Sequence, residues 1–141
     1  MIDLEILRQR IRPLFPGLMG IELLAVEPQA VAARMTVRPD LCTAGDILHG
    51  GAVMAFADTL GAIGTLVNLP QGMRTTTIES GTRFLAAASV GSVVTGRATP
   101  LHRGRTTMVW QTEIRNEAGK LCAVVTQTQL VMNESRAEAV G

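Results

Sequence analysis

The sequence contains few of the residues on which several large classes of protein depend. Its 141 residues include one Trp, three Phe and no Tyr, which argues against the base-stacking surfaces of single-stranded nucleic acid binders. The formal net charge is +1, and the charges are scattered, so the sequence indicates no basic patch for nucleic acid or an anionic membrane. These absences favour a protein whose ligand is small and locally bound.

Cysteines and long apolar runs are also few. The two cysteines, Cys42 and Cys122, have no CxxC spacing, so neither a disulfide framework nor a zinc site is predicted, and reduced thiols are expected. The longest apolar run, 52-AVMAFA-57, is too short to span a bilayer, and the N-terminus lacks the continuous apolar core of a signal peptide. We therefore expect a soluble, cytoplasmic chain folded as a single domain over residues 1–141.

The first half of the chain predicts one short helix, two strands and one long helix. The opening residues read as an amphipathic helix ending near Pro13, followed by a loop at 16-PGLMG-20. Residues 21–39 predict two strands interrupted at residues 27–29, with the apolar residues of the second strand on one face. After a polar loop at 39–46, the long helix candidate is 48-LHGGAVMAFADTLGAIGTL-66.

The second half predicts a meander of four Thr- and Val-rich strands, ending in a flexible tail over 133–141. A hairpin loop is expected at 116-NEAG-119. The four predicted strands are 74–85, 91–102, 105–115 and 120–132.

Segregated strands and helices indicate an α+β fold, an antiparallel sheet wrapped around the long helix, with a short N-terminal helix. Neighbours on nearly every side would explain why the long helix is apolar all round. Such a sheet leaves its edge strands unpaired. A homodimer or larger assembly joined edge to edge is therefore expected.

Asp58 is the one carboxylate of the long helix, and no basic residue lies within a turn or two of it. A buried, unpaired carboxylate costs several kcal/mol, so a partner, a solvated pocket or a chemical use is expected. Two structural interpretations are an Asp facing a solvent channel and an Asp bonded to a backbone amide. The functional interpretation is a general base or nucleophile in a partly apolar cleft.

Gly50 and Gly51 fall in the first turn of the same helix, where backbone N–H groups are unpaired and the dipole is positive. A bare glycine would let a carbonyl oxygen approach its N–H. Gly50 and Asp58 are eight residues apart, about 12 Å along a helix. If the two act on one carbonyl, they must come from different subunits.

The block 48–66, followed by 75-TTTIESGTRFLAAA-88, resembles the hotdog-fold acyl-CoA thioesterases of the PaaI-like, phenylacetate-degradation type. The resemblance extends from the strands near Ile21 to the last strand at Met132. It implies a sheet wrapped around the helix, a homodimer or homotetramer, and hydrolysis of acyl-CoA at sites between subunits without a metal or redox cofactor. An aryl acyl group is the family's default substrate.

The resemblance also assigns roles to single residues. Asp58 matches the catalytic carboxylate, Gly50 the glycine whose N–H polarises the thioester carbonyl, and Thr77 a hydroxyl that orients the attacking water across the interface. His49 matches the motif histidine, either as a ring that anchors the loop before the helix or as a proton-transfer group. Thr43 stands where many relatives have Asn or Gln, and its hydroxyl reaches less far.

Arg103 and Arg105 in 102-HRGRTT-107 suggest a site for the phosphates of coenzyme A. The alternative interpretation, an ordinary solvated hairpin loop, fits the segment equally well. Two alternative functions stay open. A hotdog protein that binds acyl-CoA without hydrolysis is favoured by Thr43 and opposed by Gly50 and Asp58. A hotdog dehydratase would need a His paired with the Asp, and none follows in this helix.

Overall fold

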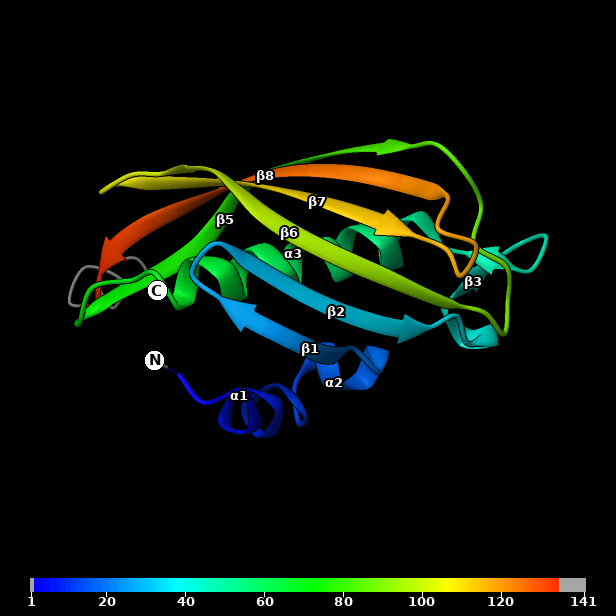
Figure 1. Ribbon diagram of the computed structural model, residues 1–141, viewed down its shortest axis with the longest axis horizontal. Helices are drawn as coiled ribbons and strands as arrows, with labels where there is room; N and C mark the ends of the chain where they lie inside the picture. The colour runs from blue at the N-terminus through cyan, green and yellow to red at the C-terminus, as the bar shows by residue number, and fades with distance from the viewer. Residues whose placement is uncertain (1, 135–141) are drawn as a thin grey trace.

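The computed structural model describes residues 2–134 and places one long helix against a curved sheet (Figure 1). The short helices α1 and α2 lie beside the strand hairpin at one side of the molecule (Figure 1). In chain order the elements are α1 (Leu4–Ile11), α2 (Phe15–Met19), β1 (Glu22–Glu27), β2 (Ala30–Thr36), the 3-10 turn η1 (Pro39–Leu41), β3 (Cys42–Thr43), β4 (Ile47–Leu48), α3 (Gly50–Leu66), β5 (Met73–Phe84), β6 (Val93–Arg103), β7 (Thr107–Arg115) and β8 (Leu121–Asn133).

Six strands of the described chain form one antiparallel sheet in the order β1-β2-β6-β7-β8-β5. The predicted meander is confirmed for β6, β7 and β8 and is wrong for β5, which pairs with β8 instead of β6. The connection 85–92 is long enough to cross the end of the sheet, so β5 and β6 need not be neighbours. The sheet therefore ends in β1 on one side and in β5 on the other.

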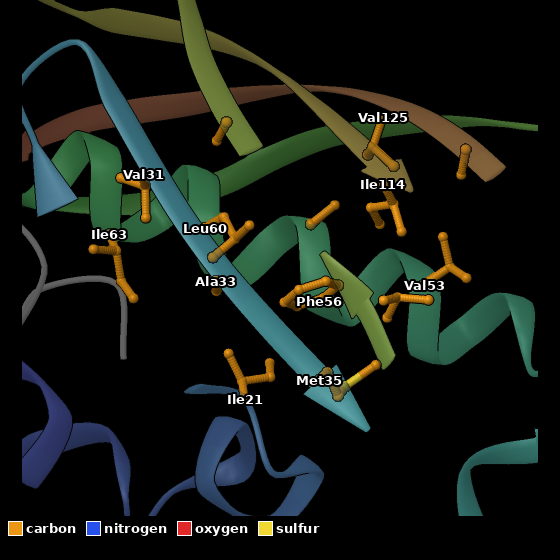
Figure 2. Close-up of a cluster of buried hydrophobic side chains, with 14 of the residues drawn as sticks. Ile21, Val31, Ala33, Met35, Val53, Phe56, Leu60, Ile63, Ile114 and Val125 are labelled. Carbon is orange, nitrogen blue, oxygen red and sulfur yellow. The ribbon is translucent and has the colours of Figure 1, made fainter. Parts of the chain in front are cut away.

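The inner face of α3 packs into the concave side of the sheet. Val53, Phe56 and Leu60 point from the helix toward side chains of the strands (Figure 2), and Phe56 and Leu60 are fully buried. Close approach depends on glycine, because a Cβ on Gly64 would lie 2.7 Å from the ring of Trp110. The tight contact fixes α3 relative to the sheet.

Strand β2 has the two-faced pattern predicted from its alternation. Val31, Ala33 and Met35 are buried on the inner face, beside α3 in Figure 2, and Val37, just past the end of the strand, is buried as well. On the outer face the guanidinium of Arg34 forms an ion pair with the carboxylate of Glu22 from β1, at 2.8 Å between Nε and Oε2. These two strands close one edge of the core.

The expectation that α3 has neighbours on nearly every side is wrong for the single chain. The side chains of Met54 and Leu66 are 38% and 39% exposed, and Asp58 and Ala62 are partly exposed. These four residues follow one another at i, i+4 spacing and so share one face of the helix. We call this set, Met54, Asp58, Ala62 and Leu66, the outer stripe.

Two predicted loops contain regular structure. The segment predicted as a loop at 16–20 is the helix α2, because Pro16 is compatible with a first helical turn and Gly20 ends the helix with φ +77°. The N–H of Gly20 donates to the carbonyls of Gly17 and Pro16. The loop at 39–46 contains η1 and β3, which pairs with β4 just before α3.

Three further predictions concern the end of a helix, a hairpin loop and the C-terminal tail. Helix α1 ends before Pro13 as predicted, and the Gly119 N–H donates to the carbonyl of Asn116 in the expected hairpin loop. The prediction of a flexible tail is wrong for its first two residues. Asn133 ends β8, and the Glu134 N–H donates to the Gly72 carbonyl. Its other residues, 135–141, lie outside the described residues. Among residues 2–134, no helix is long and apolar enough to cross a membrane.

Candidate active site

Asp58 lies in the middle of α3 and is held by a hydroxyl of the edge strand β5. Thr77 Oγ1 donates a hydrogen bond of 2.6 Å to Asp58 Oδ1. The two residues are brought together because α3 lies across the inner face of β5, and Thr77 is on that face. Within the described residues, Asp58 Oδ2 accepts no hydrogen bond. One carboxylate oxygen is therefore held in place, and the other remains available to a ligand.

Strand β8 contributes two buried glutamines to the same network. Gln129 Nε2 donates to Thr77 Oγ1 at 2.6 Å, and Gln129 Oε1 accepts from Thr75 Oγ1 at 3.0 Å. Gln127 Nε2 donates to the backbone carbonyl of Asp58 at 3.2 Å and lies 3.5 Å from its Oδ1. Both amides are almost completely buried. Asp58 is thus the end of a hydrogen-bonded chain that crosses two strands.

The second glutamine explains a small residue in α3. A Cβ on Gly61 would come closer to the Gln127 amide than real atoms approach, so only glycine leaves room for it. Gln127 can then reach the Asp58 carbonyl across the helix surface. Because this carbonyl belongs to the helix backbone, the contact fixes the distance between α3 and β8.

Asp58 also lines a pocket of about 320 Å³ between α3 and the N-terminal helices. Apart from Asp58 and the hydroxyl of Thr59, the lining side chains are apolar. They are Ile11, Phe15, Pro16, Ala55, Ala62 and Ile63. A carboxylate that opens onto an apolar pocket of this size could face a reacting group whose apolar part occupies the pocket.

The N-terminal end of α3 is capped by His49. Its Nδ1 accepts a hydrogen bond of 2.7 Å from the Gly51 N–H. Because Nδ1 accepts this bond, the proton of the neutral ring resides on Nε2. This contact corresponds to the interpretation of His49 as a ring that anchors the loop before the helix. The exposed ring also lines a pocket beside α2.

Gly50 follows the cap, and its N–H donates to no acceptor within the described residues. It lines a second pocket, of about 350 Å³, that it shares with Thr43 and Phe84. A Cβ on Gly50 would lie 3.1 Å from the ring of Phe84, so the backbone is approachable here only because the side chain is absent. The free N–H stands at the positive end of a 17-residue helix.

The single chain does not bring Gly50 and Asp58 together. They are eight residues apart in a continuous α-helix, which separates them by about 12 Å along its axis. They also line different pockets. Thr43 is close to Gly50 and Thr77 is close to Asp58, so the candidate residues form two groups on one chain.

The predicted phosphate-binding arginines lie far from both groups. Arg103 Nη1 is 3.3 Å from the Pro28 carbonyl and from Asn68 Oδ1, just beyond the C-terminal end of α3. Arg105 is exposed in the connection between β6 and β7. Gly50 begins the same helix, so its full length, about 25 Å, separates it from Arg103. Within one chain these arginines do not reach the Gly50 pocket.

Sequence reasoning missed Thr75, Gln127 and Gln129. A signal was present in 125-VTQTQLV-131, where the two glutamines occupy the same face of the strand as Val125 and Val131. Because amides on a core-facing row need buried partners, this pattern indicates a polar network inside the sheet. Matching it with a lone Asp in an apolar helix would have required the strand order.

Comparison with known proteins agrees with this arrangement of helix and sheet. The family model described as thioesterase superfamily matches residues 45–123, which include α3 and the strands β5, β6 and β7. The chain is 31% identical over 114 residues to the proofreading thioesterase EntH of Cronobacter turicensis, covering 81% of this chain and 82% of that protein.

Two solved structures extend the comparison. A thioesterase from Haemophilus influenzae superposes with a TM-score of 0.89 at 33% identity, covering 95% of this chain and 93% of the other. The PaaI protein from the phenylacetic acid degradation operon of Escherichia coli superposes with a TM-score of 0.77 at 24% identity, covering 84% and 83%, which shows the shared fold alone. Because the family model spans more than half of its residues, the chain belongs to the thioesterase superfamily, as a thioester hydrolase with the hotdog fold.

Proposed function

We propose that the protein hydrolyses acyl-CoA thioesters to the free acid and coenzyme A, with Asp58 as the reacting carboxylate. The observation that carries the proposal is the half-held carboxylate: Thr77 binds Oδ1, while Oδ2 has no partner among the described residues and Asp58 lines an apolar pocket. A carboxylate in this state can accept a proton from water or attack a carbonyl carbon.

The chemistry needs a second group that stabilises the negative charge on the thioester oxygen. The free N–H of Gly50, at the N-terminus of α3, is suited to this role. In the general-base route, Asp58 takes a proton from water, and the hydroxide attacks the carbonyl carbon. The C–S bond then breaks, and the proton returns from Asp58 to the leaving thiolate. In the nucleophilic route, Asp58 attacks the carbonyl carbon and the C–S bond breaks, which leaves an acyl anhydride and releases the thiolate. Water then cleaves the anhydride to the free acid and the Asp58 carboxylate, and the proton released goes to the thiolate.

We further propose that the Gly50 N–H comes from a second copy of the chain. Two features support a homodimer: the partly uncovered outer stripe around Asp58, and the long edge strand β5, which exposes Ile78 and Phe84 by more than half of their surface. A partner whose α3 covers this stripe could bring its own Gly50 to Asp58. Thr43 would then line the same composite site through the Gly50 pocket. Pairs of such dimers could form the homotetramer expected from the resemblance.

The basic test is a thiol-release assay with aryl, short-chain and long-chain acyl-CoAs. The Asp58→Asn variant, which keeps the size of the side chain, should lose roughly 100- to 10,000-fold in kcat. Absence of thiol release by the wild type with every substrate, or an Asn variant as active as the wild type, would contradict the proposal.

The role of the Gly50 N–H can be isolated by two substitutions at the same residue. Gly50 is the first residue of α3, and His49 before it has φ −62° and ψ 138°, so proline is compatible with the backbone there. Gly50→Pro removes the N–H, whereas Gly50→Ala adds the same Cβ beside Phe84 and keeps the N–H. We expect kcat of the Pro variant to fall well below that of the Ala variant. Equal kcat values for the two variants would mean that the loss of activity comes from crowding of the added Cβ against Phe84.

Mixing two inactive variants tests the origin of the N–H. If Gly50 and Asp58 come from different subunits, refolding Asp58→Asn together with Gly50→Pro should restore about a quarter of the sites, one in each mixed dimer. No recovery would contradict the proposal that Gly50 and Asp58 act together at a site between two subunits.

A further inference from the structure

Four side chains from three elements form one directed hydrogen-bonded chain that ends on Asp58. Thr75 donates to the Gln129 oxygen at 3.0 Å, the Gln129 nitrogen donates to Thr77 at 2.6 Å, and Thr77 donates to Asp58 Oδ1 at 2.6 Å. The strand register places Thr77 directly opposite Gln129 on the neighbouring strand. The chain is therefore built into the pairing of β5 with β8.

The direction of this chain follows from the chemistry of its members. An ionised carboxylate only accepts, so Thr77 donates to Asp58 and faces the Gln129 nitrogen, which leaves the Gln129 oxygen to accept from Thr75. An amide N–H can only donate, so the Thr77 oxygen accepts at that contact. The single proton of the Thr77 hydroxyl is then left for the carboxylate.

We infer that Gln129 is a positioning residue for the proposed hydrolysis, because it makes Thr77 donate to Asp58 Oδ1 and thereby keeps the carboxylate in one orientation. The inference rests on the proposed function in assigning the chemistry to Asp58. Gln129 itself is completely buried and acts only through Thr77. With Oδ1 held, the reacting oxygen is Oδ2.

The neighbouring glutamine shows what a different role looks like. Gln127 bonds the backbone carbonyl of Asp58, and its own Oε1 has no hydrogen-bond partner among the described residues. Its nitrogen also lies 3.5 Å from Asp58 Oδ1, but it forms no hydrogen bond with Thr77 in the described chain, so it holds the helix without setting the direction of the hydroxyl. A buried amide is thus present at both positions, and at Gln129 it is bonded through both its oxygen and its nitrogen.

The experiment compares Gln129→Met with Thr112→Val. Methionine keeps the length of the side chain and removes the donor. Thr112 is a completely buried residue of β7 whose hydroxyl has no partner in the described chain, so its Val variant controls for removing a polar group from the same core. We expect kcat of Gln129→Met to fall about 10- to 100-fold with little change in KM, because the effect is on alignment in the transition state. Thr112→Val should match the wild type.

Gln129→Glu adds a test of direction. An ionised carboxylate cannot donate to Thr77, whereas a protonated one can. The ratio of its kcat to that of the wild type should therefore rise as the pH is lowered. A Met variant with kcat within about twofold of the wild type, well inside the loss expected from misalignment, would overturn the inference. So would a Glu variant whose kcat relative to the wild type stays low at every pH.

A measurement independent of turnover separates this inference from the proposed function. The Thr77 hydroxyl proton should be visible by NMR as a slowly exchanging signal in the wild type and in Thr112→Val, and should exchange rapidly in Gln129→Met. Retention in Gln129→Met would overturn the role of Gln129 even in an active enzyme. Its selective loss in a protein that releases no thiol from acyl-CoA would support the alignment and contradict the proposed function.

Discussion

The two faces of α3 differ in what they contact and in the side chains they carry. The inner face presents Phe56 and Leu60, which are fully buried against the sheet, and Gly64, which lies against Trp110. The outer stripe presents Met54 and Leu66, each more than a third exposed, on either side of Asp58. The same apolar composition thus fills the core on one side and surrounds a carboxylate on the other.

This difference explains how one helix can hold both the fold and the candidate chemistry. Burial on the inner face fixes the helix with high precision, because interiors are close-packed. On the outer stripe, Asp58 is held by Thr77 of β5, while Met54 and Leu66 are more than a third exposed and are available to a ligand or a second chain. A helix apolar all round therefore need not be enclosed by its own chain.

The largest predicted effect compares two leucines of the same helix. Leu60→Ala opens a cavity in the core and should lower the free energy of unfolding by about 2–5 kcal/mol. Leu66→Ala, on the outer stripe, should change it by about 0.5 kcal/mol or less at low protein concentration. Urea denaturation followed by circular dichroism measures both. Equal losses would mean that the outer stripe is packed as tightly as the core.

A smaller effect is expected from adding one methyl group to the inner face. The Cβ of Gly64→Ala would meet the Trp110 ring at 2.7 Å, and such overpacking costs about 1–3 kcal/mol. Gly81→Ala is the matched control, because a Cβ at this position of β5 has nothing within 4 Å. Thermal unfolding of the two variants should separate them clearly. If the Gly81 variant were as unstable as the Gly64 variant, the loss of stability would come from the change in the backbone and not from the contact with Trp110.

Local periodicity made much of the fold predictable. The alternation of β2 and the long apolar segment of α3 depend on neighbours in sequence, and both are confirmed. The position of β5 was not predictable in this way, because strand pairing joins residues far apart, such as Thr77 and Gln129. The meander prediction failed where the chain crosses the end of the sheet.

The candidate site divides along the same line. Asp58 was identifiable because a lone carboxylate in an apolar helix is costly, and Gly50 because the first turn of a helix has free N–H groups. The groups that hold Asp58 come from β5 and β8, so only the strand order reveals them. The charge of Arg103 was readable from the sequence, but its position beside Asn68, at the C-terminal end of α3, was not.

A charge on the outer stripe tests what covers it. Met54→Lys should change the unfolding free energy of the isolated chain by about 0.5 kcal/mol or less, since the side chain can keep its ammonium in water. If a second chain covers the stripe, the same variant should shift the sedimentation coefficient toward that of a monomer. Val90→Lys is the control, because Val90 is 37% exposed against 38% for Met54. Unchanged association in Met54→Lys would place the interface elsewhere.

The smallest effect is expected on the far side of the sheet, where Arg34 and Glu22 pair in solvent. The side-chain hydrogen bond from Arg34 lowers the pKa of Glu22 below its ordinary value. A lowered pKa stabilises the folded state above the unfolded pKa of about 4.3, and this contribution disappears as the pH falls through the folded pKa. Differential scanning calorimetry of Arg34→Gln should show a slight decrease of Tm at neutral pH that vanishes in acid. A difference that persists in acid would come from packing of the Arg34 stem.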